Sequence, residues 1–316
     1  MRYLVTGGAG FIGSNTVDEL VRRGHGVVVL DDLSSGKEEN LSEVRSKITF
    51  VKGSITDIEV VQKAMHQAEY VIHLAARTSV PRSVKDPLET NKINVDGTLN
   101  VLVAARDNKV KRVVFAASSS AYGETPTLPK TEEMQPQPIS PYGVTKYVGE
   151  LYARVFGRCY GLENVCVRYF NIFGPRQDSD SPYSGVLSRF ATAFLEEQQP
   201  VVYGDGEQTR DFTYVDNAVQ ANLLACEAPG ASDGVFNVGT GGRVSLNQTL
   251  EQLRRISGKN LKARYEQPRD GDIRDSQADI TKAREILGYE PSVMFEAGLE
   301  RTFEWYKTNH IKNAAQ

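Results

Sequence analysis

Short runs of β-branched and aromatic residues alternate with longer amphipathic segments through the first half of the chain. The short runs predict buried strands at residues 3–5, 27–30, 48–51, 70–74, 112–117 and 165–170. Between them, apolar residues recur every three or four positions, as in 11–23 and 57–65, which predicts helices. This repeat of strand, helix and strand predicts an α/β fold in which helices cover both faces of a parallel sheet.

After residue 170 the alternation gives way to a loop-rich stretch and then to mainly helical patterns. We expect helices at 186–197, 215–227, 246–256 and 295–307, with one further short strand at 235–238. An α-rich part of this kind suits a smaller C-terminal lobe over the carboxyl ends of the strands, where open α/β sheets bind ligands. We therefore expect one domain of residues 1–170 plus about 212–239, and a second of about 171–211 and 240–316.

The segment after Pro141 has an unusually wide apolar face. Its apolar residues, at steps of three and four, are Val144, Val148, Leu151, Tyr152, Val155 and Phe156. Packing in the core and packing against a second copy of the chain both explain this pattern.

Composition excludes several classes of protein. The 316 residues include 37 basic and 40 acidic side chains, for a formal charge of −3, which argues against a protein that binds nucleic acid by neutralising phosphates. The three cysteines show no C-x-x-C spacing and the histidines no metal-ligand spacing, so we expect neither a disulfide framework nor a metal site. With no signal-peptide pattern and no long apolar run, we expect a soluble protein of the reducing cytoplasm, without a membrane partner.

A glycine-rich segment, TGGAGFIGS, directly follows the first predicted strand and opens the first predicted helix. It places Gly7, Gly10 and Gly13 where a chain turns tightly and its backbone approaches a pyrophosphate at a helix N-terminus. Asp31 ends the next strand, about 20 residues further on, as a ribose-binding carboxylate should. The segment therefore predicts a Rossmann-type, doubly wound dinucleotide-binding fold, and the carboxylate favours NAD over NADP.

A second motif, Tyr142-Gly143-Val144-Thr145-Lys146, follows a serine run that ends the fifth strand. Tyr142 and Lys146 are four residues apart and share a helix face. A tyrosine is a poor base at neutral pH, but a neighbouring ammonium and an oxidised nicotinamide favour its phenolate. The pair could then remove a proton from a substrate hydroxyl while hydride leaves the same carbon.

Together these motifs resemble the extended short-chain dehydrogenase/reductase family of nucleotide-sugar enzymes, and within it the UDP-hexose 4-epimerases. The resemblance extends over essentially the whole chain, through RYFNIFGPRQ (168–177), YGDGEQTRDFTYVDN (203–217), FNVGTGG (236–242) and RDGDIRDSQADITKAREILGY (269–289). It implies an NAD-binding first domain, a nucleotide-sugar-binding second domain, and a homodimer formed through helices at about 88–106 and 142–160.

The resemblance also implies roles for individual residues. Ser118 would hydrogen-bond the reacting oxygen beside Tyr142, and Lys146 would hold the nicotinamide ribose and lower the pKa of the tyrosine. Related dehydratases and decarboxylases carry carboxylates at one or both of the next two positions, where this chain has Ser119 and Ser120. Neither serine can supply the additional acid or base that a lyase needs, so the lyase interpretation loses support.

Further contacts follow from the same matching. The implied NAD contacts are Gly7, Gly10, Phe11, Ile12, Gly13, Asp31, Asp32, Ser54, Ile55, Leu74, Ala75, Ala76, Asn94, Tyr142, Lys146 and Tyr169. The implied UDP-sugar contacts are Ser79, Arg82, Ser118, Ser119, Ser120, Tyr142, Asn171, Val186, Leu187, Tyr203, Arg210, Arg269 and Ser276. Arg210 and Arg269 suit the diphosphate because the guanidinium offers paired N–H donors to phosphate oxygens.

Two positions depart from the usual family pattern. Ser54 stands where relatives usually have the Asp that binds the adenine amino group, so that contact would be weaker or made by backbone. Ser276 stands where glucose-specific epimerases have a tyrosine that closes the sugar pocket. We therefore expect NAD-dependent C4 epimerisation of UDP-GlcNAc/UDP-GalNAc and also of UDP-Glc/UDP-Gal, through a 4-keto intermediate. A UDP-glucuronate 4-epimerase, a nucleotide-sugar dehydratase or decarboxylase, and a non-catalytic NAD-binding regulator are the alternatives.

Overall fold

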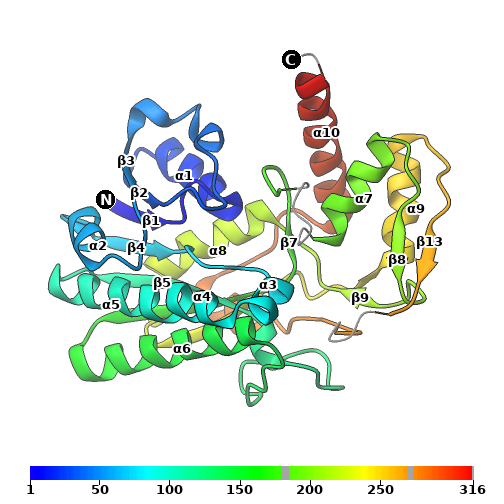
Figure 1. The fold of residues 1–316 in the computed structure, drawn as a ribbon. Helices are drawn as coiled ribbons and strands as arrows, with labels where there is room; N and C mark the ends of the chain where they lie inside the picture. The colour runs from blue at the N-terminus through cyan, green and yellow to red at the C-terminus, as the bar shows by residue number, and fades with distance from the viewer. Residues whose placement is uncertain (179–184, 269–272, 315–316) are drawn as a thin grey trace.

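A seven-stranded parallel sheet with the strand order β11-β6-β5-β4-β1-β2-β3 forms the centre of the protein (Figure 1). The computed structural model describes residues 1–178, 185–268 and 273–314. The strands are β1 (Arg2–Thr6), β2 (Gly26–Asp31), β3 (Ile48–Lys52), β4 (Tyr70–His73), β5 (Arg112–Ser118), β6 (Glu163–Tyr169) and β11 (Gly234–Val238). Each coincides with an apolar run of the sequence to within two residues. The expected α/β, Rossmann-type fold is confirmed.

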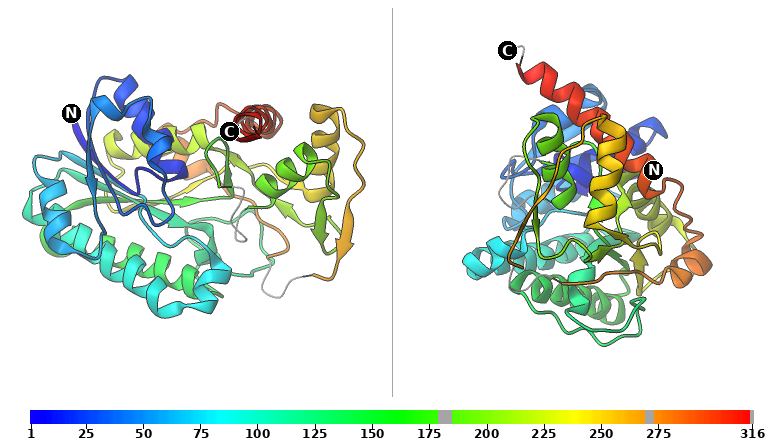
Figure 2. Two further views of the ribbon diagram at one scale, coloured as in Figure 1. Left: turned by 45° about the horizontal axis from the view of Figure 1, so that its top comes forward. Right: turned by 90° about the vertical axis from the view of Figure 1, so that its right-hand side faces the viewer.

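Helices cover both faces of the sheet (Figures 1 and 2). On one face lie α1 (Phe11–Arg22) and α8 (Val215–Glu227), and on the other α2 (Ile58–Met65), α5 (Gly97–Asp107) and α6 (Pro141–Tyr160). The short helices α3 (Val80–Lys85), α4 (Pro87–Asn91) and η3 (Lys92–Asp96) precede α5 and contact α6. Strands buried on both faces need apolar side chains in both directions, which explains their nearly continuous apolar sequences.

The sequence around α6 sets the ends of this helix. The Gly143 N–H donates to the Oγ of Ser140 at 3.1 Å, which caps the helix, and Pro141 occupies the first turn, where its missing N–H is not needed. The helix ends at Gly161, whose φ of 67° lies in the left-handed region that glycine favours. Tyr142 therefore lies in the first turn of α6, and Lys146 lies one turn further along.

The remaining residues form a smaller lobe beside the carboxyl edge of the sheet (Figure 2, left). Its helices α7 (Val186–Leu195), α9 (Leu246–Ser257) and α10 (Phe295–Ala314) pack against one another. Three two-stranded sheets join β7 (Ile172–Phe173) to β10 (Thr213–Tyr214), β9 (Thr209–Arg210) to β12 (Val244–Ser245) and β8 (Val201–Tyr203) to β13 (Arg264–Glu266). The helices were predicted, whereas strands of two or three residues are too short to show a periodicity.

Short helical segments complete the described chain. They are η1 (Glu38–Leu41), η2 (Arg45–Lys47), η4 (Ser119–Tyr122) and η5 (Ala283–Leu287). Within the described ranges, we find no helix with the combination of length and apolar composition that crossing a membrane requires.

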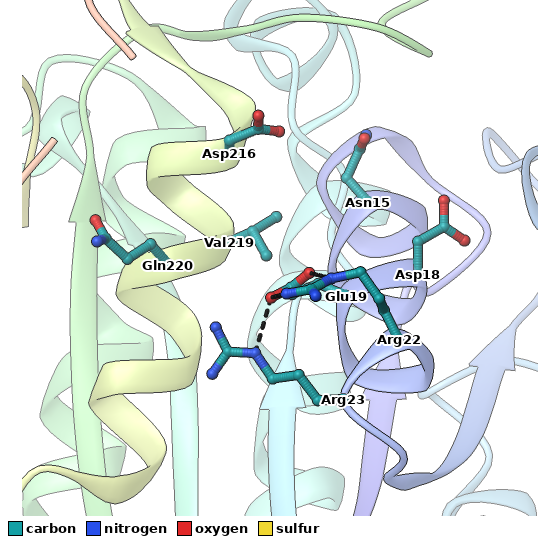
Figure 3. Close-up of a pocket in the computed structure, with 8 residues that line it drawn as sticks. All are labelled: Asn15, Asp18, Glu19, Arg22, Arg23, Asp216, Val219 and Gln220. Atoms are coloured by element: carbon teal, nitrogen blue, oxygen red, sulfur yellow. Dashed lines mark hydrogen bonds and ion pairs between the residues drawn. The ribbon is translucent and has the colours of Figure 1, made fainter. Parts of the chain in front are cut away.

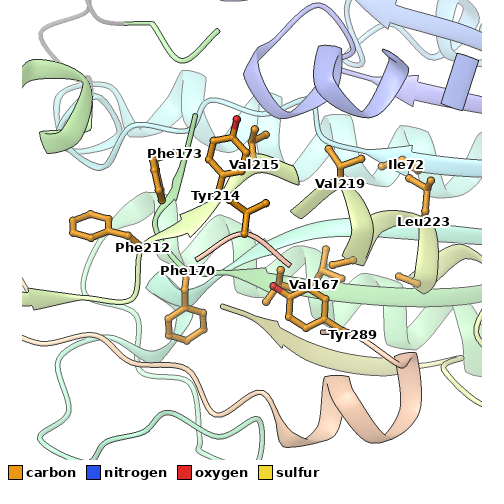
Figure 4. Close-up of a cluster of buried hydrophobic side chains, with 14 of the residues drawn as sticks. Ile72, Val167, Phe170, Phe173, Phe212, Tyr214, Val215, Val219, Leu223 and Tyr289 are labelled. Carbon is orange, nitrogen blue, oxygen red and sulfur yellow. The ribbon is translucent and has the colours of Figure 1, made fainter. Parts of the chain in front are cut away.

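An aromatic cluster joins the sheet to the smaller lobe (Figure 4). The rings of Phe173 and Phe212 pack edge to face with centroids 6.2 Å apart, and Phe295 of α10 stacks on Phe212 at 5.4 Å. The chain then returns to the sheet, where α8 covers one face and β11 adds the last strand by pairing with β6. The two domains with the expected boundaries stay a prediction, because this core is continuous between them.

Candidate active site

The predicted site residues converge on the carboxyl edge of the sheet. The strand order reverses between β1 and β4, and this switch point is where doubly wound sheets bind their ligands. The glycine loop leaves the sheet at the end of β1, the segment 74–76 follows β4, and Ser118 ends β5. Because parallel strands all end at one edge, motifs more than 100 residues apart in the sequence come together here.

Backbone segments in the glycine loop approach so closely that side chains are excluded. A Cβ on Gly13 would lie 2.0 Å from the Gly7 carbonyl oxygen, and one on Gly7 would lie 2.7 Å from the backbone nitrogen of Ala75. Gly7 also has a φ of 69°, which glycine adopts without strain. Gly10 precedes α1 and offers no side chain as a cap. The first N–H groups of this helix, at Phe11 and Ile12, therefore suit the pyrophosphate of NAD.

Asp31 lies beside this loop at the end of β2. Its carboxylate accepts hydrogen bonds from the backbone N–H groups of Ala9 at 2.9 Å and Leu33 at 2.8 Å, and burial raises its pKa. Each carboxylate oxygen has a second lone pair that a ribose hydroxyl could use. Together, the loop and this carboxylate fit an NAD molecule.

Ser118 and Tyr142 come together from different elements. The Oγ of Ser118 accepts hydrogen bonds from the backbone N–H of Ser120 at 3.2 Å and from its hydroxyl at 2.8 Å, which fixes the serine rotamer. The phenol of Tyr142 hydrogen-bonds with Ser118; burial raises the pKa of this tyrosine and the hydrogen bond lowers it. The Tyr142 backbone N–H also donates to Ser83 of α3 at 3.1 Å.

Lys146, one turn after Tyr142 in α6, is only 4% exposed. Its Nζ donates to the carbonyl oxygen of Ala116 at 2.7 Å and lies 5.1 Å from the centre of the Phe115 ring. Burial lowers the pKa of Lys146 to about 8, against the opposing effect of the Glu150 carboxylate. The ammonium charge is therefore lost as the pH rises through about 8. The groups that act on the pKa of Tyr142 here are its burial and Ser118, so an effect of Lys146 on it stays a prediction.

The other predicted NAD contacts lie on strand ends or in the loops that follow them. Ser54 and Ile55 follow β3, Leu74, Ala75 and Ala76 follow β4, Asp32 follows β2, and Tyr169 ends β6 in register with Ser118. The hydroxyl of Ser54 lies 2.9 Å from that of Thr56. The amide of Asn94 is engaged within the protein, since it accepts from the Arg77 N–H at 2.7 Å and donates to Thr145 at 3.0 Å. Their contacts with NAD stay predictions.

Three predicted UDP-sugar contacts form one hydrogen-bonded group in the smaller lobe. Asn171, with a φ of 39°, donates from Nδ2 to the Asp211 carbonyl oxygen at 3.3 Å and to the Ser276 hydroxyl at 3.4 Å. The Ser276 N–H donates to the Thr209 carbonyl oxygen at 3.1 Å. Arg210 donates from Nη1 to the same carbonyl oxygen at 2.9 Å. Asn171, Arg210 and Ser276 are thus held on adjoining segments although up to 105 residues separate them.

The remaining predicted substrate contacts are dispersed. Ser79 caps α3, and Arg82 lies on that helix next to the residue that bonds the Tyr142 N–H. Val186 begins α7 and Tyr203 ends β8, whereas the Leu187 side chain is 2% exposed and packs in the core. Any contact of Leu187 with a nucleotide would therefore use its backbone. Arg269 lies outside the described residues.

The sequence analysis missed a buried carboxylate, that of Asp211, which joins the segments that carry Arg210 and Ser276. Asp211 is fully buried and accepts hydrogen bonds from Thr240 N at 2.8 Å, Thr240 Oγ1 at 2.7 Å, Gly241 N at 3.0 Å and Ala278 N at 3.1 Å. It thereby joins the segment after Arg210 to the segment after Ser276 and to residues 240–241. In the sequence, an acidic residue next to an arginine is typical of a charged surface. No local pattern indicates that Asp211 has hydrogen-bond partners 29 and 67 residues away.

Figure 3 shows a pocket between α1 and α8, away from these residues. Its lining is mainly charged, and Glu19 within it pairs with Arg22 at 2.6 Å and with Arg23 at 2.8 Å. It contains none of the predicted site residues, so the candidate site is defined by the strand ends and not by this pocket.

Comparison with known proteins gives the same assignment as the site. Residues 3–239 match the model of the NAD dependent epimerase/dehydratase family. The chain belongs to this family. It is 41% identical over 311 residues to the UDP-glucose 4-epimerase of Mycolicibacterium smegmatis, covering 97% of this chain and 99% of that protein.

Two solved structures are similar throughout. The UDP-glucose 4-epimerase of Thermotoga maritima, solved with UDP-glucose, has a TM-score of 0.94 at 44% identity and covers 98% of this chain and 100% of its own. The UDP-N-acetylglucosamine 4-epimerase of Methanobrevibacter ruminantium M1, in complex with UDP-N-acetylmuramic acid, has a TM-score of 0.94 at 40% identity and covers 98% of both chains. These comparisons confirm the expected family, the NAD cofactor and an isomerase of the UDP-sugar 4-epimerase type.

The glycine loop generates a first prediction. The Gly13→Ala substitution places a methyl group against the Gly7 carbonyl oxygen, so the loop must open and NAD affinity should fall by at least about tenfold. Binding is measured by isothermal titration of NAD into apoprotein. Gly26→Ala is the control, because its nearest neighbour is 3.8 Å away. Equal affinities of the two variants would contradict the predicted role of the loop.

Proposed function

We propose that the protein is a UDP-hexose 4-epimerase that interconverts UDP-GlcNAc and UDP-GalNAc and also UDP-glucose and UDP-galactose. The observation that carries this proposal is the meeting of Tyr142, Ser118 and Lys146 beside an NAD-compatible glycine loop, with Ser119 and Ser120 in place of carboxylates. This set of groups can move one proton and fix the reacting oxygen, but it offers no extra carboxylate at the two serine positions.

The residues divide the reaction between them. NAD, held by the glycine loop and Asp31, would supply the hydride acceptor for C4 of the sugar and the donor for its return. The phenolate of Tyr142 removes the proton of the C4 hydroxyl, and Ser118 donates a hydrogen bond to the same oxygen as it becomes a carbonyl. Arg210, on a segment held by Asp211, anchors the diphosphate while the 4-keto sugar turns its opposite face. Tyr142 then returns the proton, and because the hydride would also return to C4, no net oxidation takes place.

We infer the nature of the sugar from Ser276. Its hydroxyl receives the hydrogen bond from Asn171, so the residue lies beside a proposed contact with the nucleotide sugar. A serine there leaves space for a 2-acetamido group, which a tyrosine would fill. A UDP-glucuronate 4-epimerase is the second candidate, because it would need the same proton and hydride transfers at C4.

Product analysis tests the proposed reaction. UDP-GlcNAc, UDP-glucose and UDP-glucuronate are offered separately to NAD-loaded protein, and the products are followed by proton NMR. We expect the first two to reach a mixture of C4 epimers without accumulation of NADH, and Tyr142→Phe to reduce the rate by at least about 100-fold. Turnover of glucuronate alone would overturn the substrate assignment, and release of water or CO2 would overturn the reaction.

A substitution at Ser276 tests the sugar assignment. Ser276→Tyr should reduce kcat/KM for UDP-GlcNAc by at least about tenfold more than for UDP-glucose, because the phenol occupies the space of the acetamido group. Ser276→Ala, the matched control, should keep the wild-type ratio. Equal losses on both sugars in the tyrosine variant would reject the proposed gate.

We also propose that two copies of the chain associate through α4, α5 and α6. Support comes from the outward face of α6, where Val144, Leu151 and Val155 are 46%, 39% and 48% exposed, and from Leu88 of α4, which is 83% exposed. The apolar pattern after Pro141 thus faces outward at these positions. Two such faces could cover each other in a twofold dimer.

Charges on this face should prevent association. The double variant Leu88→Asp/Val155→Asp should elute from size exclusion with light scattering as a single chain, whereas the wild type should have the mass of two chains. Met294→Asp, at a site 50% exposed in the other lobe, is the control and should remain dimeric. A monomeric wild type would refute the proposed dimer.

A further inference from the structure

A buried ion pair with no part in the proposed reaction lies next to Lys146. Glu150 follows Lys146 by one turn of α6, and its carboxylate accepts from Arg168 of β6, at 2.8 Å from Nε and 2.6 Å from Nη2. The two side chains are only 1% and 3% exposed. Taking two charges out of water is costly, and apolar side chains of similar volume would fill the same space. Packing alone therefore does not explain this pair.

The pair adds charges of opposite sign to the layer that contains Lys146. Lys146 and Glu150 are both buried on the face of α6 that packs on the sheet, and Arg168 meets Glu150 there from β6. The guanidinium of Arg168 also lies 4.6 Å from the centre of the Tyr122 ring, which fixes it from the other side. The bidentate geometry holds the Glu150 carboxylate in one position.

Several titratable groups around this layer are neutral at physiological pH, whereas the side chains of Glu132, Arg154 and Asp233 interact with Tyr122 or Cys166. Burial lowers the pKa of His73, on β4, to about 3 and raises that of Tyr122, on η4, to about 12. Burial also raises the pKa of the Cys166 thiol of β6 and of Tyr142 on α6 itself. Among the described residues, Glu150 is the carboxylate whose charge opposes the effect of burial on Lys146.

We propose that Glu150 is a positioning residue that keeps Lys146 protonated, and that Arg168 holds the Glu150 carboxylate in place. The functional value of this arrangement rests on the proposed function, in which Lys146 acts as a cation beside Tyr142 and the nicotinamide ribose. Without the carboxylate, no charge would oppose the lowering of the Lys146 pKa by burial. Arg168 would also be left as an unpaired cation in the same layer. Both effects favour the neutral amine.

Charge-selective substitutions separate this role from packing. Glu150→Gln keeps the shape of the side chain but removes its charge, whereas the double variant Glu150→Met/Arg168→Met removes both charges and fills the volume. The titration of Lys146 is followed by carbon NMR of lysine labelled at Cε, in NAD-loaded protein, and its signal is assigned with Lys146→Met. Glu163→Gln is the control, because Glu163 lies at the start of β6 and pairs with Arg112 of β5.

We expect Glu150→Gln to lower the pKa of Lys146 by about one unit or more, and the double variant to lower it by clearly less. Arg168→Met, which spares the carboxyl group, should cause no larger fall than the double variant. The control should leave the pKa unchanged. An unchanged pKa in Glu150→Gln, or an equal fall in single and double variants, would overturn the proposal. Should Glu150→Gln not fold, a fall in Arg168→Met as large as one unit would overturn it as well.

The pH profile of kcat links this titration to the reaction. In Glu150→Gln, the alkaline limb of the profile should move to lower pH by the same amount as the pKa of Lys146, while at low pH kcat stays near that of the wild type. A lysine titration that moves without the limb would refute the proposed role of Lys146 in the reaction and leave the positioning by Glu150 intact. A limb that moves without the lysine titration would refute the positioning.

Discussion

Seven strands that run in one direction end at one edge of the sheet, and the location of the site depends on this constraint. Parallel strands need crossover connections, so helices occupy both faces and the loops at the strand ends are left for binding. The glycine loop, Asp31 and Ser118 end three different strands and therefore meet at this edge. The smaller lobe lies beside the same edge (Figure 2). Asn171 follows β6 closely and donates to the carbonyl oxygen of Asp211, the neighbour of Arg210.

Buried charges fix the details within this frame. Asp211 accepts four hydrogen bonds from two distant segments, Arg112 donates from Nη1 to the carbonyl oxygens of Ala225, Cys226 and Ala228 at the end of α8, and Glu150 pairs with Arg168. Each group is costly to bury without partners, so these hydrogen bonds favour the observed arrangement of the backbone. The near-neutral chain thus concentrates its electrostatic effects at a few internal points.

Much of the fold was predictable because its causes are local. Buried parallel strands impose continuous apolar runs, so all seven strands of the sheet were visible in the sequence. The glycine loop was equally visible, because only glycine tolerates the contact between residues 7 and 13. The strands of the smaller lobe were not visible in the sequence, since a segment of two or three residues is too short to show a periodicity. The sequence also did not predict that Val144, Leu151 and Val155 face outward, because an apolar helix face has the same sequence pattern whether it packs in the core or is exposed.

The sequence by itself determined the order of the elements and the dinucleotide loop, since each depends on residues a few positions apart. The family resemblance added Ser118, Tyr142 and Lys146 as candidate catalytic residues. Only the tertiary structure decided which distant groups share a burial site. The pairing of Glu150 with Arg168, and the hydrogen bonds of Asp211 to Thr240, Gly241 and Ala278, join residues from different elements. From the sequence alone, a polar side chain is expected at the surface, in contact with water. When folding buries it, tertiary packing decides which partners replace the water, and no local sequence pattern encodes those partners.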